Sequence, residues 1–171
     1  FLDYLDDRAQ DQQPFFAALS VQPPHDPYVA PAEYMGRHQP SELQMRSNVP
    51  NVERVQAQAR RELAGYYGMI ENWDDNVGRI LGKLNDLGLA LDTHIVFFSD
   101  HGDMHGSQGM FRKTNPFEEA IRVPFIIAGE KMRYSGRATA RIPTLLQSVD
   151  IAPTTLGLCD IDVPDWMEGT D

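Results

Sequence analysis

The chain has 171 residues, of which 42% are hydrophobic and 23% are charged, as is usual for a globular protein that buries a core. Its formal net charge of −10 argues against a nucleic-acid-binding surface, because basic residues supply most of the affinity there. No stretch approaches the roughly 18 consecutive apolar residues that a membrane span requires. Because the chain is acidic overall, an anionic substrate would need a local basic pocket.

The chain begins at Phe1 rather than methionine and ends without a recognisable terminal element, so we expect it to be an excerpt of a longer protein. No basic-then-apolar leader is visible at its start. Its single cysteine, Cys159, cannot form an internal disulfide and follows apolar residues, which predicts a buried and inert thiol.

The first half of the chain predicts one strand, a long loop and one long helix. Residues 14–21 form a short apolar run closed by two prolines, which is typical of a buried strand. Residues 28–55 lack periodicity and predict an irregular excursion with one helical turn. Residues 56–87 repeat apolar positions at three-and-four spacing, which predicts an amphipathic helix that Gly88 terminates.

The second half predicts two more buried strands, at residues 93–99 and 123–129, and a helix that Asp150 caps with Pro153 in its first turn. Strands alternating with a long helix indicate an α/β architecture with a parallel sheet. Three strands are too few for a sheet covered on both faces, so the remaining strands are expected in chain outside these residues.

Asp100 and His101 directly follow the strand predicted at residues 93–99, at the end where open α/β sheets place their ligands. A carboxylate and an imidazole are both metal ligands, and Gly102 gives the backbone freedom to turn there. Two ligands alone do not make a metal site. The alternative is that Asp100 caps a turn and His101 is an ordinary loop histidine.

Two further residues are candidates for binding an anion. Lys113 lies after a glycine-containing loop and could reach back to the strand end as a mobile cation, although most lysines are simply solvated. His25 lies in the loop that follows the first apolar run and could instead be structural. Arg122 is expected to pair with Glu118 or Glu119 rather than with substrate.

Several ordered segments resemble type I sulfatases of the alkaline-phosphatase-like superfamily. They are residues 99–104 (Ser-Asp-His-Gly-Asp-Met), 109–113 (Gly-Met-Phe-Arg-Lys), 117–124 (Phe-Glu-Glu-Ala-Ile-Arg-Val-Pro), 24–28 (Pro-His-Asp-Pro-Tyr), 149–154 (Val-Asp-Ile-Ala-Pro-Thr) and the helix at 66–78. The resemblance spans nearly the whole chain. It implies that residues 1–171 are the C-terminal part of a catalytic domain, with a mixed, mostly parallel sheet flanked by helices.

The resemblance also implies roles for individual residues. Asp100 and His101 match two ligands of the family's single divalent cation, which is most commonly calcium. Histidine at the second position makes manganese or zinc more plausible, and magnesium also stays open. His25 and Lys113 match residues that contact the sulfate group, and either could protonate the leaving oxygen.

The sequence departs from the family pattern at three positions, and it lacks one motif of the family. Gln108 replaces a histidine, His105 replaces a leucine, and Phe117 replaces a tyrosine. The nucleophile motif Cys/Ser-x-Pro/Ala-x-Arg, whose first residue becomes formylglycine, does not occur in these residues, and Cys159 does not fit it. The nucleophile and the family's paired acidic ligands are therefore expected upstream of Phe1, and this chain alone is expected to be inactive.

The leading functional prediction is a sulfuric-ester hydrolase acting on a sulfated small molecule or glycan. One alternative is a phosphodiesterase or phosphonate monoester hydrolase of the same superfamily. Another is a non-catalytic relative that serves as a binding module. Many members of the family are periplasmic or secreted, so the same location is expected for this protein.

Overall fold

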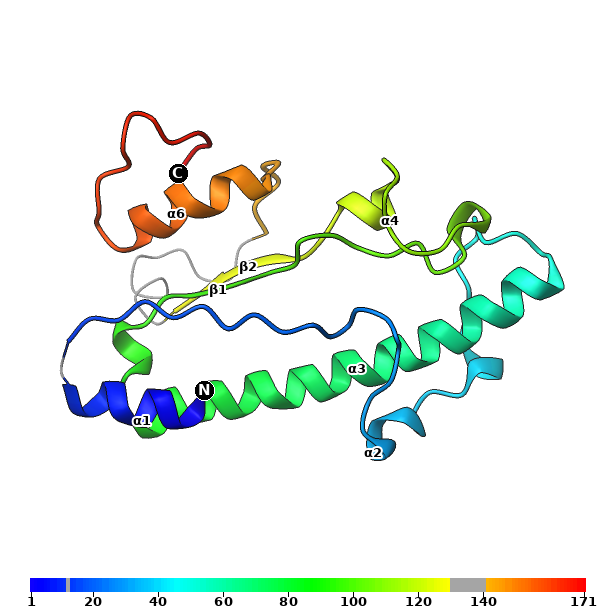
Figure 1. The fold of residues 1–171 in the computed structure, drawn as a ribbon, viewed down its shortest axis with the longest axis horizontal. Coiled ribbons are helices and arrows are strands. Elements are labelled where there is room, and N and C mark those ends of the chain that lie inside the picture. Colours follow the sequence, from blue (N-terminus) through cyan, green and yellow to red (C-terminus); the bar gives the residue numbers. More distant parts are fainter. Residues whose placement is uncertain (12, 130–140) are drawn as a thin grey trace. The chain divides into compact units, whose positions relative to one another are not determined.

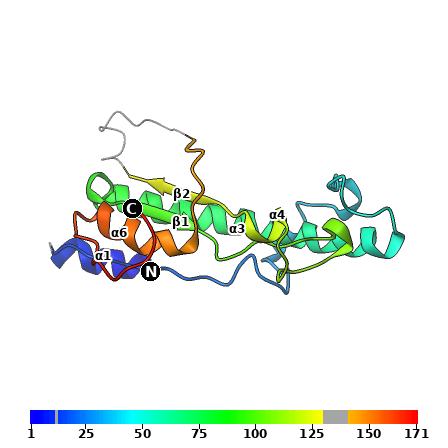
Figure 2. The ribbon, with the colours of Figure 1, turned by 90° about the horizontal axis from the view of Figure 1, so that it is seen from above.

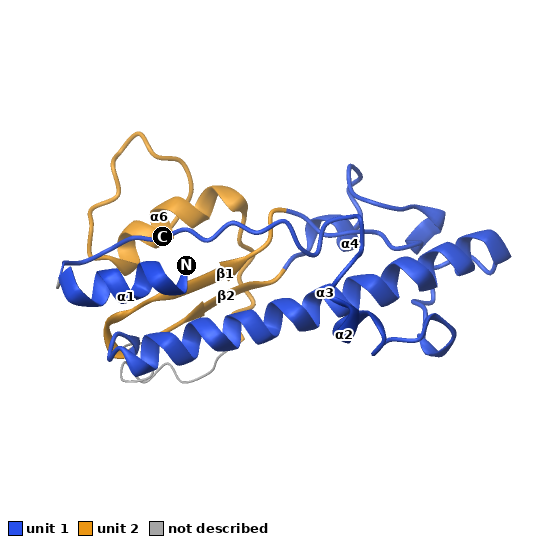
Figure 3. Cartoon of the chain, turned by 60° about the horizontal axis from the view of Figure 1, so that its bottom comes forward, with its two compact units in different colours: residues 1–90, 101–123 blue, residues 91–100, 124–171 orange. Residues whose placement is uncertain are grey.

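The computed structural model describes residues 1–11, 13–129 and 141–171 of the chain (Figure 1). These residues form two compact units (Figure 3). Unit 1 contains residues 1–90 and 101–123, and unit 2 contains residues 91–100 and 124–171. One of the three places where the chain passes between the units therefore falls between Asp100 and His101.

Helix α3 (Glu53–Asp86) is the scaffold of unit 1. It confirms the helix predicted at residues 56–87. Its end has the hydrogen bonds of a Schellman motif, because the Gly88 amide donates to the Asn85 carbonyl and the Leu89 amide donates to the Leu84 carbonyl. Gly88 has a φ of +70°, a left-handed conformation that glycine adopts without a Cβ penalty. The predicted terminator of the helix is therefore confirmed.

Two small apolar clusters pack the loops of unit 1 onto α3. One cluster contains Tyr28, Ala30, Tyr34 and Met69, with Tyr66 packed against it. The other contains Val49, Val55 and Ala59, with Met45 and Phe111 packed against it. Residues 28–55 contain only the short helix α2 (Ala32–Met35) and the 3-10 turn η1 (Pro40–Glu42), as the irregular sequence predicted.

Helix α1 (Leu2–Asp11), which the sequence patterns did not predict, lies beside the C-terminal end of α3 in both Figure 1 and Figure 2. Leu5 is almost fully buried, and the Lys83 ammonium bonds both carboxylate oxygens of Asp6 at 2.8 Å. Among the described helices, none combines the length and the apolar character needed to cross a lipid bilayer.

The strand predicted at residues 14–21 is not present in the structure. The segment has no β-ladder, and Phe16 is 73% exposed. A strand requires hydrogen bonds to a neighbouring strand, and no described segment of unit 1 supplies one. Six of the eight residues in this run are exposed and none is buried, so the prediction of a buried strand is wrong in both pairing and burial.

Unit 2 contains β1 (Ile95–Phe98) and β2 (Phe125–Ala128), which confirm the strands predicted at residues 93–99 and 123–129. They pair antiparallel, with Val96 opposite Ile127. The parallel arrangement expected from the strand–helix pattern is not met by this pair, because α3 precedes β1 and no long helix crosses over between β1 and β2. A mixed α/β sheet contains such pairs, so the fold class stands.

Helix α6 (Ile151–Leu158) follows the 3-10 turn η4 (Ser148–Asp150), with Pro153 in its first turn as predicted. Asp150 occupies the N-cap position, but its carboxylate accepts the Gln147 and Thr170 amides at 2.8 Å instead of capping the helix. Cys159 is exposed, so the prediction of a buried thiol is wrong. It is the C-cap residue, one position past the end of α6.

Candidate active site

Three of the four predicted site residues come together in unit 1. The Lys113 ammonium contacts the His25 Nε2 atom, although 88 positions separate the two residues in the chain. The rings of His25 and His101 lie edge to face, with centroids 6.2 Å apart. Lys113 and two imidazoles, those of His25 and His101, therefore come from separate segments to form one cluster.

The contacts of His25 indicate where its proton lies. Its Nδ1 atom is 2.8 Å from the Asp26 carbonyl oxygen and 3.1 Å from the Asp26 carboxylate. Both partners are acceptors, so we assign the proton to Nδ1 and the lone pair to Nε2. Lys113 then donates a proton of its ammonium group to Nε2.

His101 makes a similar contact, because its Nδ1 atom donates to the Gly102 carbonyl oxygen at 2.9 Å. This assignment puts the lone pair on Nε2, the arrangement found in many histidines that bind metals. Asp100 belongs to unit 2, where the Ser99 hydroxyl lies 3.5 Å from one of its carboxylate oxygens. The described residues contain no group of three or more His, Cys, Asp or Glu side chains arranged to hold a metal ion.

Small residues on α3 allow the site loops to approach the helix. A Cβ atom at Gly65 would lie 2.2 Å from the Tyr28 carbonyl oxygen, so the segment that follows His25 can pack there only against glycine. A Cβ atom at Gly106 would lie 2.7 Å from the Ala59 Cβ atom, which brings the loop before Lys113 onto the same helix. The helix thus brings the His25 loop and the Lys113 loop together.

The Asp103 carboxylate joins the elements of the site. One oxygen accepts the Tyr28 hydroxyl at 2.5 Å, and the other accepts the amides of His105 and Arg112 at 3.1 Å each. Burial acts to raise the pKa of Asp103, but the Tyr28 hydroxyl, the His105 ring and the two amides outweigh it and lower the pKa. Asp103 is therefore an anion that accepts three hydrogen bonds.

The pKa of Tyr28 shifts in the opposite direction from that of Asp103. Burial, followed by its bond to the Asp103 carboxylate, raises the pKa of the Tyr28 hydroxyl far above its ordinary value. The hydroxyl stays protonated and donates to Asp103, while it accepts a hydrogen bond from Arg112 at 3.0 Å. Arg112 also bonds Glu62 of α3 at 2.8 Å and lies 3.4 Å from the Asp26 carboxylate.

Two of the three positions that depart from the family pattern, His105 and Gln108, have different surroundings. His105 is 3% exposed, packs against the rings of Tyr66 and Tyr28 at 4.5 and 5.1 Å, and has no hydrogen bond to either ring nitrogen. Burial lowers its pKa despite the nearby Asp103 carboxylate, so the ring is neutral. Gln108 is exposed in a left-handed turn, where its amide donates to the Asn48 carbonyl oxygen.

Sequence reasoning missed the residues that surround the cluster: Tyr28, Glu62, Asp103 and Arg112. Tyr28 and Asp103 each lie within motifs that the sequence did single out, three residues after His25 and two after His101. Arg122, by contrast, lies as predicted beside Glu118, at 3.4 Å on an exposed surface.

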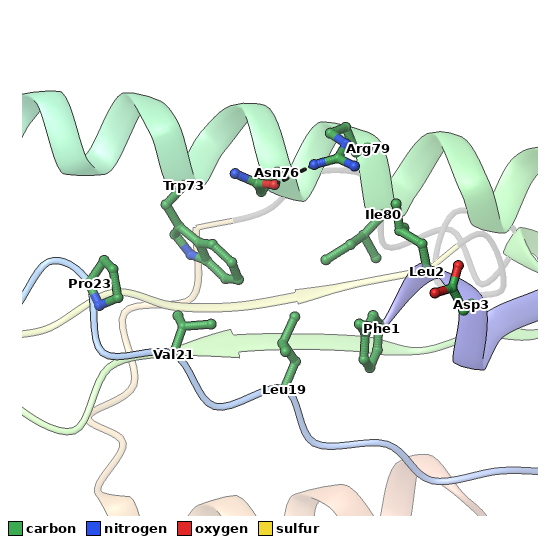
Figure 4. A pocket seen from close by; sticks show the side chains of 10 residues that line it. All are labelled: Phe1, Leu2, Asp3, Leu19, Val21, Pro23, Trp73, Asn76, Arg79 and Ile80. Carbon is green, nitrogen blue, oxygen red and sulfur yellow. Dashed lines mark hydrogen bonds between the residues drawn. The ribbon is translucent and has the colours of Figure 1, made fainter. Parts of the chain in front are cut away.

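Two hollows in unit 1 lie along the segment that leads to His25. The larger, of about 470 Å³, lies between α3 and the N-terminal segment, where Trp73 and Ile80 face Leu19 and Val21 (Figure 4). It contains none of the predicted site residues. The smaller, of about 200 Å³, includes His25 among its lining residues, together with Val29 and Met69.

Similarity to known proteins identifies the family of this chain. The sequence profile of the Sulfatase family matches residues 1–161. This chain belongs to the sulfatase family. A relative, the ulvan-active sulfatase of Formosa agariphila, is 37% identical over 171 residues, which cover 98% of this chain and 33% of the relative. The resemblance seen in the sequence is therefore confirmed, and the chain spans about a third of the length of that sulfatase.

Solved structures show the same fold. A structure from work on glycosaminoglycan metabolism in Bacteroides thetaiotaomicron matches with a TM-score of 0.83 and 28% identity, over 99% of this chain and 36% of that one. The phosphonate monoester hydrolase of Agrobacterium radiobacter matches with a TM-score of 0.82 and 24% identity, over 98% of this chain and 39% of that one. The chain is thus part of an alkaline-phosphatase-like α/β sulfatase domain.

Proposed function

We propose that the full-length protein hydrolyses sulfate monoesters, and that His25 and Lys113 bind the sulfate group. The observation that carries this proposal is the contact between the Lys113 ammonium and the His25 imidazole in unit 1. Both side chains come from loops that pack on α3, and they contact each other although His25 is exposed to solvent. Membership of the sulfatase family supports the same reaction.

The charges at this site fit the transition state of sulfate ester hydrolysis. The ester and water yield an alcohol and sulfate; the S–O bond to the alcohol breaks, and its electron pair stays on the alcohol oxygen. That oxygen takes a proton from Lys113 or His25, and the ammonium group stabilises charge on the sulfate oxygens. A general acid of this kind contributes a factor of about 10²–10⁴ to the rate.

Asp100 and His101 are the residues of this chain that we propose as ligands of the family's divalent cation. The donor chemistry fits, because a carboxylate and an imidazole with its lone pair on Nε2 both bind divalent metals. When bound, the cation would supply positive charge next to the sulfate group. Calcium is the first candidate, and manganese, zinc and magnesium are the others. The remaining ligands and the formylglycine nucleophile are expected in the rest of the full-length protein.

The substrate class that we propose is a sulfated small molecule or a sulfated glycan. The ulvan-active relative and the structure from glycosaminoglycan work support including sulfated glycans among the substrates to be tested. The fold itself does not select among sulfate esters, because the same fold serves many substrates.

A comparison of substrates that share one aryl leaving group tests the proposal. The full-length protein should hydrolyse 4-nitrophenyl sulfate faster than 4-nitrophenyl phenylphosphonate or bis(4-nitrophenyl) phosphate. The reverse order would instead support the phosphonate or phosphodiester alternative, for which the fold of the Agrobacterium radiobacter hydrolase is a precedent. Failure to hydrolyse any of the three, or any sulfated glycan, would favour a non-catalytic binding module.

A further inference from the structure

Resting on this proposed function, we propose that Tyr28 and Asp103 are positioning residues that hold Lys113 against His25 for protonation of the leaving oxygen. The hydrogen bond between the Tyr28 hydroxyl and the Asp103 carboxylate is called the Tyr28–Asp103 bridge below. Neither residue contacts the Lys113 ammonium, so both would act through the backbone and through Arg112.

The bridge connects the segments that carry the site residues. Tyr28 lies three residues after His25, and Asp103 lies two residues after His101. The other Asp103 oxygen accepts the amide of Arg112, which directly precedes Lys113. One carboxylate thus fixes the three chain segments that form the cluster.

The backbone around Lys113 needs such support. Arg112 and Thr114, the residues on either side of Lys113, have φ angles of +69° and +78°. Non-glycine residues rarely adopt this conformation, and it costs a β-branched residue such as threonine the most. A strained turn persists only where its surroundings determine it, and the bond from the Arg112 amide to Asp103 is one such restraint.

The Arg112 side chain provides a second link between the bridge and His25. Its guanidinium lies over the Tyr28 ring at 5.1 Å, bonds the Tyr28 hydroxyl and Glu62, and approaches the carboxylate of Asp26 beside His25. The Arg112 charge is therefore shared among acidic partners, whereas Lys113 is directed at His25. Removing the Tyr28 hydroxyl would release one partner of Arg112 and one partner of Asp103 together.

A matched pair of side chains, Tyr34 of α2 and Asp75 of α3, makes the same kind of hydrogen bond. The Tyr34 hydroxyl donates to the Asp75 carboxylate at 2.6 Å, and the Arg37 guanidinium lies over the Tyr34 ring at 4.5 Å. Tyr34 is 8% exposed and Tyr28 is 9% exposed. Tyr34→Phe therefore removes an equivalent hydroxyl, with equivalent burial, from a pair that touches none of the predicted site residues.

The experiment measures kcat and KM of the full-length protein, Tyr28→Phe and Tyr34→Phe with aryl sulfates of graded leaving ability, from 4-nitrophenyl to phenyl sulfate. Protonation matters most for phenyl sulfate, because phenolate is the poorer leaving group. We expect Tyr28→Phe to lower kcat for phenyl sulfate by about tenfold or more, part of the factor that a general acid contributes. For 4-nitrophenyl sulfate we expect a loss of less than about threefold, and Tyr34→Phe should leave both rates unchanged.

A second measurement reports the position of Lys113 without turnover. Mass spectrometry of the protein after brief acetylation gives the extent of reaction at Lys113, with Lys83 as an internal reference because it is paired with Asp6 at the other end of α3. Tyr28→Phe should increase acetylation of Lys113 by about threefold or more relative to Lys83, because the ammonium is no longer held against His25. Tyr34→Phe should leave the ratio unchanged.

The outcomes separate this inference from the proposed function. A wild-type protein that hydrolyses sulfate esters, combined with a Tyr28→Phe variant that slows all aryl sulfates equally or leaves Lys113 acetylation unchanged, would overturn the positioning role alone. A wild-type protein without sulfatase activity would overturn the proposed function. In that case the acetylation ratio would still decide whether the bridge holds Lys113 in place.

Discussion

Two tyrosines, Tyr28 and Tyr34, pack against α3 through the same kinds of contact but connect different parts of the chain. Each packs its backbone over a glycine of the helix, donates its hydroxyl to an aspartate and has an arginine over its ring. Around Tyr34 these contacts join the short helix α2 to the long helix α3. Around Tyr28 the same contacts join the loops of His25 and Lys113. The same packing arrangement therefore differs in which segments it connects, and paired substitutions can test whether that difference matters for function.

The largest effect is expected at the glycines beneath the two tyrosines. Gly65→Ala would place a Cβ atom 2.2 Å from the Tyr28 carbonyl oxygen, so the backbone must move, and we expect a loss of about 3 kcal/mol in unfolding free energy. Gly68→Ala meets the Tyr34 carbonyl oxygen at 3.2 Å and should cost less.

Gly78→Ala provides the control for these two variants, because nothing lies within 4 Å of its Cβ position and helix propensity should add about 0.5–1 kcal/mol. Denaturant unfolding of the three variants in the full-length protein gives the values. Equal effects at Gly65 and Gly78 would show that the Tyr28 segment does not pack as described.

The next effect concerns the two aspartates. Asp103→Ala would leave the Tyr28 hydroxyl and two amides without their acceptor, so we expect a loss of about 2–3 kcal/mol. Asp75→Ala removes the acceptor of one hydroxyl and should cost about 1 kcal/mol or less. Denaturant unfolding of both variants compares them. A larger loss of unfolding free energy for Asp75→Ala than for Asp103→Ala would contradict the view that Asp103 holds three groups in place.

A smaller effect depends on pH, through His105. Burial lowers its pKa in the folded protein, so the unfolded chain binds a proton that the folded chain does not bind. The contribution of the neutral His105 ring to the unfolding free energy is therefore fully present above the ordinary histidine pKa of about 6.5. It is lost as pH falls below that value. The depressed pKa of Asp103 adds a further loss at still lower pH, below about 4.

His105→Asn tests this prediction, because asparagine tolerates the left-handed φ of +41° at this position but does not titrate. Unfolding measured between pH 5 and 7 should show a weaker pH dependence for the variant than for the parent protein. An identical slope would mean that His105 does not titrate differently in the folded and unfolded states.

The smallest effect is expected for the exposed ion pair. Arg122 and Glu118 are each 72% exposed with a 3.4 Å separation, so Arg122→Ala should change the unfolding free energy by less than about 0.5 kcal/mol. Thermal melting in low and high salt checks this, and a loss as large as that of Asp103→Ala would place Arg122 in a role that its exposure does not explain.

Sequence patterns predicted the parts of the fold that depend on local chemistry. The period of α3, its glycine terminator and the apolar runs of β1 and β2 were read directly from neighbouring residues. Strand pairing was not predictable in the same way: residues 14–21 have the composition of a strand but no partner among the described residues. The antiparallel direction of the β1–β2 pair was likewise not readable from neighbouring residues, because it depends on how distant segments of the chain connect the strands.

In the candidate site too, local motifs were predictable and long-range contacts were not. His25, His101 and Lys113 were identified from motifs, and the structure brings them together. The surrounding contacts of Glu62 and Arg112 could not be predicted, because they join residues 50 positions apart and depend on how the loop closes onto α3. The burial of His105 was equally hidden, since its position in the motif gives no sign that two tyrosine rings enclose it.

The most direct test of the shared site is a double-mutant cycle of His25→Ala and Lys113→Ala, measured as kcat/KM for a sulfate ester in the full-length protein. If the two side chains act as one unit, each single variant should lose about 10²-fold or more, and the double variant should lose little beyond that. The coupling free energy would then be about 3 kcal/mol or more, because each tenfold loss corresponds to about 1.4 kcal/mol. Losses that simply multiply would show that His25 and Lys113 act independently and would contradict the shared site.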